Sequence, residues 1–281
     1  MNKLLQLLSI FVAFHLSSFA QENSDWADEK KDWTNEENTS SKFFVGINAG
    51  ALFANSNTAS IYTGASNITP YGIDYILNVP NYKMVFDTYF QYPYAVSELP
   101  QNPAYKTAFD IGLHAGMNLG GGNTIFMDLN TSKVKFEQSF TMEIKDPNNQ
   151  LVEPNYEQFP IIGEEERFNF NLGTQLSLLN KEKTNIYWSI FGNFNSIKFK
   201  RNYIVIDGKE YEIIHSNAQL TTPEPGGIGF GAGSGLGFKY KLTDRITLDL
   251  TYNLYYIKTK MNDNIQDFGI NNGVLLRLIW G

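Results

Sequence analysis

Residues 229–256 read GFGAGSGLGFKYKLTDRITLDLTYNLYY, and this stretch decides the fold. Apolar side chains stand at most second positions on both sides of Thr243-Asp244-Arg245, and mainly glycine, small or polar residues stand between them. A period of two is typical of a β-strand whose two faces meet different surroundings. The stretch therefore predicts two long antiparallel strands joined by a tight turn.

The same alternation recurs in six further segments. Their apolar phases begin at Phe43, Phe109, Ile125, Phe168, Ile186 and Ile270. The segment that begins at Ile125 changes phase between Leu129 and Val134, which we interpret as a β-bulge near residues 131–133. Together with the hairpin quoted above, the chain has eight expected strands, each long enough to cross a bilayer.

The connections between these strands distinguish a secreted β-sandwich from a membrane barrel, since both folds alternate. Three connections are short, at 120–123, 180–183 and 243–245. The other four are longer, at about 54–106, 145–165, 206–227 and 259–267, and short and long follow each other in turn. Outer-membrane barrels have short periplasmic turns and long extracellular loops. We therefore predict an all-β fold, an eight-stranded antiparallel transmembrane β-barrel over residues 42–281, with the sandwich as the alternative.

Composition and the first 41 residues indicate where the chain is sent. None of its 281 residues is cysteine, which excludes disulfides, thiolate metal sites and cysteine nucleophiles. The net charge of −7 argues against a nucleic-acid partner. Residues 1–20 combine Lys3, an apolar run and small residues at Ser18 and Ala20, which predicts a signal peptide. Residues 21–41 hold seven acids against two lysines and are predicted to form an acidic, disordered periplasmic tail.

Aromatic residues are expected at both membrane interfaces, where their rings and polar groups are both accommodated. The expected aromatic girdle consists of Trp188, Tyr240 and Trp280 at the periplasmic side and Phe168 and Tyr256 at the outer side. Signal peptide, eight alternating segments, tight inner turns, long outer loops and a terminal aromatic residue together resemble the OmpA/OmpX-type eight-stranded outer-membrane barrels. The resemblance covers about residues 43–281 and departs from the usual aromatic end in having Gly281 after Trp280. It implies a place in the outer membrane of a Gram-negative bacterium, in contact with lipid and lipopolysaccharide.

Charged residues on the inward phase are expected to pair, because an eight-stranded barrel is only wide enough for its own side chains. The expected lumen polar network consists of Asp110, His114, Asp128, Arg167, Asp249 and Arg277. Asp249 and Arg277 lie equally far from their hairpin centre, so they should face each other. The same reasoning brings His114 close to Asp128. The network predicts a polar plug, with a proton or ion path as the alternative.

The first long connection, about residues 54–106, is rich in aromatic residues and prolines. A connection of this length is usually functional. A short helix is expected over residues 81–90, after Pro80. The residues expected to form a cap on the barrel mouth or a partner surface are Tyr82, Phe86, Tyr89 and Phe90. We expect residues 54–66, which are mostly small and polar, to be mobile.

These features favour a non-enzymatic structural or binding component of the outer membrane over two alternatives, a small channel and a lipid-modifying enzyme. His215 and Ser216 are adjacent, which on a strand points their side chains to opposite faces. A nucleophile and its base must lie within hydrogen-bond reach, so no catalytic residue is assigned. No metal-ligand spacing or cofactor motif is expected either. An envelope protein is the expected partner, bound through the first outer loop or the acidic tail.

The alternation of short and long connections predicts an orientation that proteolysis tests. A protease site inserted at Asn148-Asn149 should be cut from outside intact cells. A site inserted at Lys181-Glu182 should be cut only after the outer membrane is opened. The reverse pattern would contradict the orientation.

Overall fold

The computed structural model describes residues 43–69, 71–149, 154–215 and 225–281. The predicted signal peptide and acidic tail lie outside these ranges. The chain divides into two units, residues 1–39 and 40–281, and the description below concerns the second. In the described ranges, no helix has both the length and the apolarity needed to cross a membrane.

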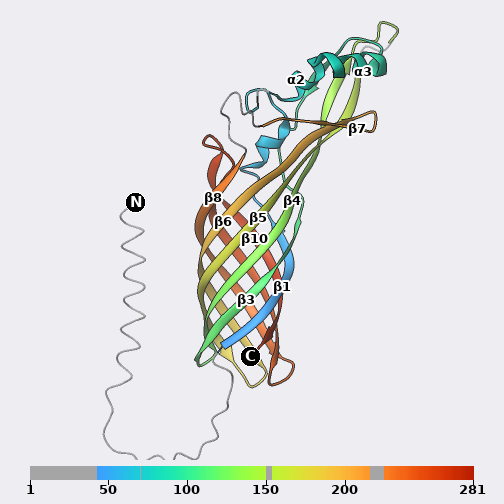
Figure 1. Cartoon of the computed structure of the whole chain (residues 1–281). Helices are drawn as coiled ribbons and strands as arrows, with labels where there is room; N and C mark the ends of the chain where they lie inside the picture. Colours follow the sequence, from blue (N-terminus) through green and yellow to red (C-terminus); the bar gives the residue numbers. More distant parts are fainter. Residues whose placement is uncertain (1–42, 70, 150–153, 216–224) are drawn as a thin grey trace, which may run out of the picture. The chain divides into compact units, whose positions relative to one another are not determined.

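Within the described ranges, eight of the ten strands form a closed antiparallel barrel (Figure 1). They are β1 (Phe43–Phe53), β3 (Ala108–Gly120), β4 (Asn123–Ile144), β5 (Asn155–Asn180), β6 (Thr184–Ile206), β8 (Gly226–Lys241), β9 (Ile246–Lys260) and β10 (Gln266–Trp280). Each strand pairs with its neighbours in the order β4-β3-β1-β10-β9-β8-β6-β5, and pairing of β4 with β5 closes the ring. The predicted fold class is confirmed. The short connections join β3 to β4, β5 to β6 and β8 to β9, as the sequence predicts.

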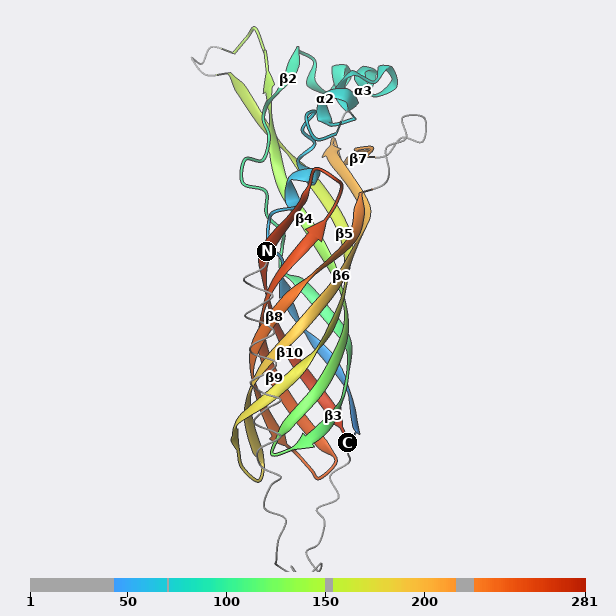
Figure 2. The ribbon, with the colours of Figure 1, turned by 90° about the vertical axis from the view of Figure 1, so that its left-hand side faces the viewer.

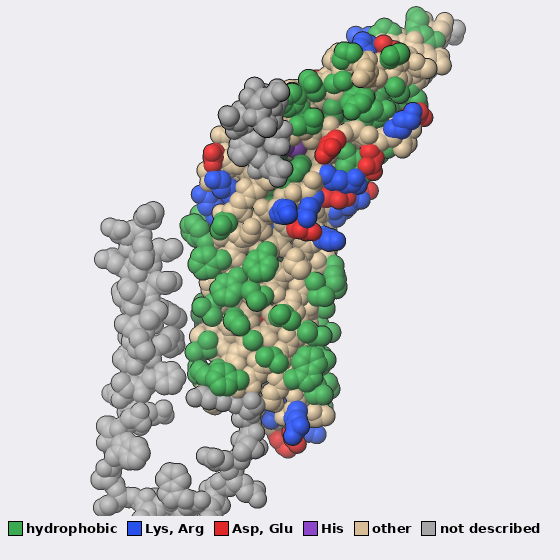
Figure 3. Space-filling view, in the orientation of Figure 1, with side chains coloured by type: hydrophobic (Ala, Val, Ile, Leu, Met, Phe, Trp, Pro, Cys, Tyr) green, Lys and Arg blue, Asp and Glu red, His purple; other side chains and the backbone are tan. Residues whose placement is uncertain are grey.

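The outer surface of the barrel is apolar. Exposed side chains on it include Val45, Ile47, Ile111, Leu113, Met127, Leu172, Phe194, Leu236, Leu250, Leu254, Ile270 and Leu276. Figure 3 shows hydrophobic side chains spread over the barrel, and lysine, arginine and acidic side chains gathered beyond its two ends. This surface, here called the apolar belt, is suited to lipid. On β5 it ends near Phe168, because Glu166 is the next residue on the same face toward the start of the strand.

Strand β4 shows why the apolar phase changes along the chain. Its even-numbered residues from Thr124 to Ile144 share one face, and nearly all of them are buried. Apart from Phe126, this face is polar up to Ser132, where it lines the lumen, and apart from Gln138 it is apolar from Val134 onward. The predicted bulge near residues 131–133 is therefore wrong, because the pairing of β4 with β5 runs without a shift from Thr124 to Ile144. The apolar side chains therefore change from the odd-numbered residues, which face lipid along the barrel, to the even-numbered residues, which face a protein core beyond it.

Beyond the belt, β4, β5 and β6 continue as the sheet of an extramembrane lobe (Figures 1 and 2). Strand β2 (Tyr94–Glu98) extends this sheet beside β4, and β7 (Lys209–Glu212) extends it beside β6. The 3₁₀ helix η1 (Ala59–Thr63) and the helices α2 (Ile73–Asn78) and α3 (Pro80–Phe90) pack on one face of it. The connection between β4 and β5 is accordingly 145–154, shorter than the expected 145–165.

The lobe has its own hydrophobic core. The strands contribute Phe136, Phe140, Met142, Ile144, Phe159, Ile161, Ile204, Ile206 and Tyr211, and the helices contribute Ala59, Ile61, Tyr62, Ile73, Ile76, Leu77, Phe86 and Phe90. The helix predicted over residues 81–90 is present as α3, which begins with Pro80 at a position where the missing N–H has no intrahelical acceptor. Phe86 of α3 is fully buried, 4.7 Å from the ring of Tyr211 on β7. The core therefore ties the helices to the sheet.

The expectation of a mobile segment over residues 54–66 is wrong. Helix η1 lies there, and Ala59, Ile61 and Tyr62 are all at most 1% exposed. The Tyr62 ring stacks on Phe136 and on Phe199 at centroid distances of 5.9 and 5.8 Å. The segment is held in place by the buried side chains of Ile61 and Tyr62, although most of its other residues are small or polar.

Truncation of Phe86 should open the lobe and leave the barrel intact. Phe86→Ala removes a fully buried ring, which costs about 3–5 kcal/mol in a packed core. Limited proteolysis should then cut between Tyr82 and Tyr94, while the barrel keeps its heat-modifiable migration on gels. Met84→Ala on the same helix is the matched control, since Met84 is 67% exposed, and it should stay resistant. Equal resistance of Phe86→Ala and Met84→Ala would contradict this account of the lobe.

Candidate functional site

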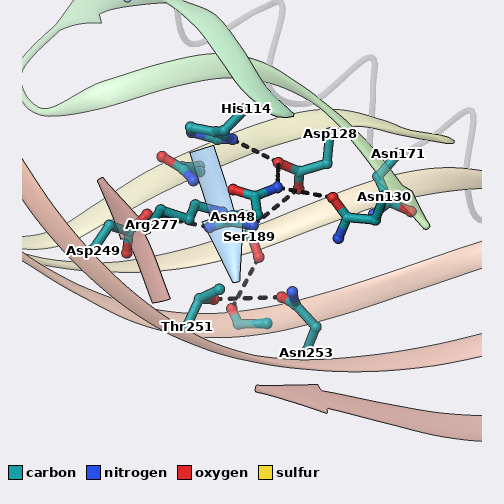
Figure 4. Close-up of polar contacts among 12 residues, drawn as sticks. Asn48, His114, Asp128, Asn130, Asn171, Ser189, Asp249, Thr251, Asn253 and Arg277 are labelled. Carbon is teal, nitrogen blue, oxygen red and sulfur yellow. Dashed lines mark hydrogen bonds and ion pairs between the residues drawn. The ribbon is translucent and has the colours of Figure 1, made fainter. Parts of the chain in front are cut away.

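An ionic cluster of five buried side chains lies in the lumen, and Figure 4 shows four of them, Arg277, Asp128, Asp249 and His114. Arg277 lies between two carboxylates, with Nη2 2.9 Å from Asp128 Oδ2 and Nη1 3.2 Å from Asp249 Oδ2. His114 Nδ1 lies 2.6 Å from Asp128 Oδ1, and the Tyr187 hydroxyl donates to Asp249 Oδ1 at 2.8 Å. All five side chains are buried. Each charge in the cluster therefore has an opposite charge or a hydrogen-bond partner, as a lumen without bulk water requires.

Strand register brings these residues together. Arg277 on β10 is paired with Asp249 on β9, and His114 on β3 is paired with Asp128 on β4. Directly paired residues of antiparallel strands point to the same face, which here is the lumen. Arg277 then reaches across the narrow barrel to Asp128, so the two pairs become one cluster. Strand pairing alone predicts the two pairs, and the small diameter joins them.

Amide side chains continue the cluster toward the lobe. Asn48 Nδ2 donates to Asn130 Oδ1 at 2.8 Å, and Asn130 Nδ2 donates to Asp110 Oδ2 at 3.0 Å. The other carboxylate oxygen of Asp110 accepts the hydroxyl of Ser132 at 2.6 Å. Asp110 thus lies one step beyond Asp128, as expected, and is held by neutral donors.

A second buried ion pair, here called the upper cluster, lies at the lobe end of the lumen. Arg167 Nε donates to Glu165 Oε1, and Glu165 Oε2 accepts the hydroxyls of Tyr62 at 2.8 Å and Tyr105 at 3.1 Å. Burial, and after it the Glu165 carboxylate, raises the pKa of Tyr62 well above its ordinary value, so its hydroxyl stays protonated and donates. Arg167 belongs to this pair and makes no ion pair with Asp110, so it does not join the network in the way that the sequence predicts.

The upper cluster depends on a glycine. A Cβ at Gly163 would lie 2.1 Å from Cδ1 of the Tyr62 ring. Only glycine at this position lets Tyr62 come close enough to β5 for its hydroxyl to reach Glu165. Sequence reasoning missed Glu165 because the run of glutamates at 164–166 reads as a solvated loop. The alternation of Glu165, Arg167 and Asn169 was the signal that places Glu165 inside.

A catalytic histidine needs an orienting carboxylate on one ring nitrogen and a nucleophile on the other, and His114 has only the carboxylate. Asp128 orients Nδ1, while Nε2 is buried and has no hydrogen-bond partner among the described residues. The ring lies 5.2 Å from Phe44 and 5.8 Å from Phe126, so aromatic side chains surround it. In the described ranges, no hydroxyl lies within hydrogen-bond distance of Nε2, so the contact with Asp128 positions the His114 ring without supplying a nucleophile.

His215, the other histidine considered from the sequence, lies in the lobe. Its Nε2 lies 2.9 Å from Asn202 Nδ2, and its ring packs at 5.0 Å from Phe199. Burial lowers the pKa of His215 to about 4, so the ring is neutral at pH 7. Ser216, its neighbour in sequence, lies outside the described residues. In the described ranges, no group of three or more histidine or acidic side chains is arranged to hold a metal ion.

The girdle residues lie on the outer surface of the barrel. Tyr240, Trp280, Phe168 and Tyr256 are exposed. Trp188 is half-buried, and its Nε1 donates to Ser234 Oγ at 2.7 Å. Tyr256 stacks on Phe268 at 5.2 Å, near the belt limit at the lobe end.

The four cap residues divide between core and surface. Phe86 and Phe90 are buried in the lobe core, where Phe90 meets Phe159 edge-on at 5.6 Å. Tyr82 and Tyr89 are about two-fifths exposed, at 40% and 41%, although each touches a ring of the sheet. The cap therefore packs on the extended sheet, not on the rim of the barrel, and keeps part of two tyrosines accessible.

The closed ring of eight antiparallel strands, its apolar outer surface and its polar, filled lumen decide the fold class. The fold is that of an eight-stranded outer-membrane β-barrel. This confirms the resemblance to OmpA/OmpX-type barrels at the level of the fold. No protein-family model matches the barrel's sequence, and no curated protein matches it.

Solved structures of surface proteins are among those similar to this barrel. Neisserial surface protein A has a TM-score of 0.41 at 11% identity, over 85% of this chain and 97% of that one. Ail of Yersinia pestis, in complex with the heparin analogue sucrose octasulfate, has a TM-score of 0.35 at 10% identity, over 85% and 98%. The outer-membrane protease OmpT from Escherichia coli has a TM-score of 0.34 at 9% identity, over 86% and 97%. At these values the likeness transfers no activity or ligand to this barrel.

Removal of Arg277 should destabilise the barrel more than removal of Asp249. Arg277→Met leaves Asp128 and Asp249 buried without their cation, which should lower the free energy of unfolding by about 3–5 kcal/mol. Asp249→Asn should lower it less, because Arg277 keeps its contact with Asp128. Urea unfolding in micelles measures both variants and the double variant.

The exposed pair Lys83–Asp87 provides the control, and Lys83→Met should leave the unfolding curve unchanged. Additive losses for Arg277→Met and Asp249→Asn in the double variant would show that the two residues do not interact.

Proposed function

We propose that this chain is a non-enzymatic outer-membrane anchor that holds a rigid binding lobe outside the cell. The observation that carries the proposal is the continuation of β4 and β5 from the apolar belt into the lobe without a register shift. A lobe built on strands of the barrel keeps a fixed height and direction above the membrane. Rigid elements position binding side chains more accurately than loops do.

The accessible part of α3 is the best candidate for the binding surface. Tyr82, Val85 and Tyr89 follow each other at helical spacing and remain partly exposed, at 40%, 36% and 41%. Tyrosines that expose one edge are common at protein interfaces, because they offer a large apolar area and a hydroxyl. An envelope or extracellular protein is accordingly the proposed partner. Export by residues 1–20, a second partner site in residues 21–41, and contact with lipid and lipopolysaccharide belong to the same proposal.

The filled lumen supports an anchor over the channel alternative. The ionic cluster and the upper cluster lie one above the other inside the barrel, and both are buried. The cavity between Asp110, Arg167 and Asn271 holds only about 10 Å³, roughly the space of one water molecule. The lipid-modifying alternative has less support, since His114 has no nucleophile in its contacts.

Planar-bilayer recording tests the anchor against the channel. The purified protein should insert without a stable open level, because both clusters obstruct the lumen. The double variant Arg277→Met/Arg167→Met is the positive control. It weakens both clusters and should therefore show brief channel openings. A stable open level of the unmodified protein would contradict the anchor and favour the channel.

Capture from solubilised outer membranes tests the lobe. The unmodified full chain should retain a partner protein, and the double variant Tyr82→Ser/Tyr89→Ser should not retain it. Ser139→Ala on β4 is the matched control, since Ser139 is an exposed lobe residue on the odd-numbered face of β4, opposite the face that packs against the helices. Identical sets of retained proteins for all three would remove α3 as the binding surface.

A further inference from the structure

The lumen is filled by the two clusters but opens into a cavity at the end opposite the lobe. A cavity of about 760 Å³ opens there, lined by the short connections after β3 and β5 and by side chains near the ends of the strands. Phe44, Thr124, Lys239 and Ile279 are among the side chains that line it. Its volume falls within the range of small-molecule sites, about 300–1,000 Å³. The proposed function of the lobe makes no use of this cavity.

Lysines outnumber acids around this cavity. Its lining includes Lys181, Lys183, Lys239 and Lys241 against Glu182 and Asp244. Lys183 and Lys241 are neighbours, since the backbone N–H of Lys241 donates to the Lys183 carbonyl at 2.8 Å. The surplus of positive charge favours an anion, and walls of low dielectric strengthen the attraction.

Lys239 differs in its partners from Arg167 and Arg277, the other two cations described in the lumen. Its Nζ donates to Gln175 Oε1 at 2.5 Å and lies 5.0 Å from the Tyr187 ring and 5.7 Å from the Phe44 ring. Among the described residues, no carboxylate oxygen lies within 4.0 Å of this nitrogen. Arg277 and Arg167, in contrast, each contact a carboxylate.

Two nearby groups explain why Lys239 lacks a carboxylate partner. Asp249 is paired with Lys239 across β8 and β9, but its carboxylate contacts Arg277 and the Tyr187 hydroxyl instead. Gln175 Oε1 accepts a second bond from Thr124 Oγ1 at 2.7 Å, while Gln175 Nε2 is buried with no partner in the described ranges. The cavity end of the lumen therefore has a surplus of donors. A half-buried ammonium without a counter-ion is costly.

We propose that this cavity binds a small molecule through an oxyanion, a carboxylate or phosphate group, that pairs with Lys239. Lys239 has N–H donors that are not used by Gln175, and the oxygens of such a group can accept them. Each carboxylate or phosphate oxygen accepts two or more hydrogen bonds. Lys183 and Lys241 attract the anion to the mouth of the cavity. The ligand enters from the short-turn end, which makes this site independent of the lobe.

Titration calorimetry with inorganic phosphate tests the site on the full chain, purified from outer membranes in a zwitterionic detergent. Phosphate should bind saturably, and Lys239→Met should weaken binding about tenfold or more, the usual effect of losing a hydrogen bond to a charged group. Chloride at equal ionic strength gives the screening baseline. Lys209→Met on β7, at the lobe end, is the control and should bind phosphate as the unmodified protein does.

A parallel titration with acetate separates the two sources of an oxyanion. Saturable binding of phosphate alone assigns a phosphate ligand, and binding of acetate alone assigns a carboxylate ligand. Heat from neither ion above the chloride baseline would overturn the proposal. Equal affinity of Lys239→Met and the unmodified protein would overturn it as well.

Stability provides a readout that does not depend on calorimetry. Without phosphate, Lys239→Met should unfold at a urea concentration no lower than that of the unmodified protein, because it removes a cation without a counter-ion. Phosphate should then raise the unfolding midpoint of the unmodified protein and leave that of Lys239→Met unchanged. A lower midpoint of Lys239→Met without phosphate, together with an equal shift on adding it, would assign Lys239 a structural role and contradict the site.

Discussion

Lipid offers no water to the N–H and C=O groups at the edge of a sheet, so a sheet can cross a membrane only as a closed ring. Here the ring closes where β4 pairs with β5, from Thr124 opposite Gln175 to Ile144 opposite Asn155. Closure with eight strands fixes a narrow lumen. The burial of Arg277, Asp128 and Asp249, and their need to pair, follow from this diameter.

The two buried clusters have different surroundings, although both contain an arginine and a carboxylate. Arg277 lies among strands of the barrel alone, and its partners come from β4, β6 and β9. Arg167 and Glu165 share β5, and tyrosines from the first long connection complete their shell. The upper cluster therefore links the folding of the lobe to the closing of the lumen, because Tyr62 belongs to both.

The sequence was sufficient for the fold and for contacts that strand pairing controls. Asp249 lies opposite Arg277 because an antiparallel hairpin pairs residues that are equally far from its centre. The contact of Arg277 with Asp128 was not predictable in this way, since it crosses the lumen between strands that are not neighbours. Alternation also cannot tell whether an apolar face meets lipid or a protein core, which is why the change of phase at Val134 was read as a bulge. The role of Tyr62 depends on the open space beside Gly163, and sequence spacing does not reveal that space.

The shared strands have a mechanical consequence for whatever the lobe holds. A domain joined by a linker rotates under load, whereas the sheet of this lobe is a direct continuation of the β4–β5 pairing of the barrel. A pull on the lobe along these strands is borne in shear by many backbone hydrogen bonds at once, and it reaches the belt without passing through a hinge. The force of drag on the whole cell would be transmitted to a partner bound there. The tilt of β4, β5 and β6 would set the orientation of that partner to the cell surface.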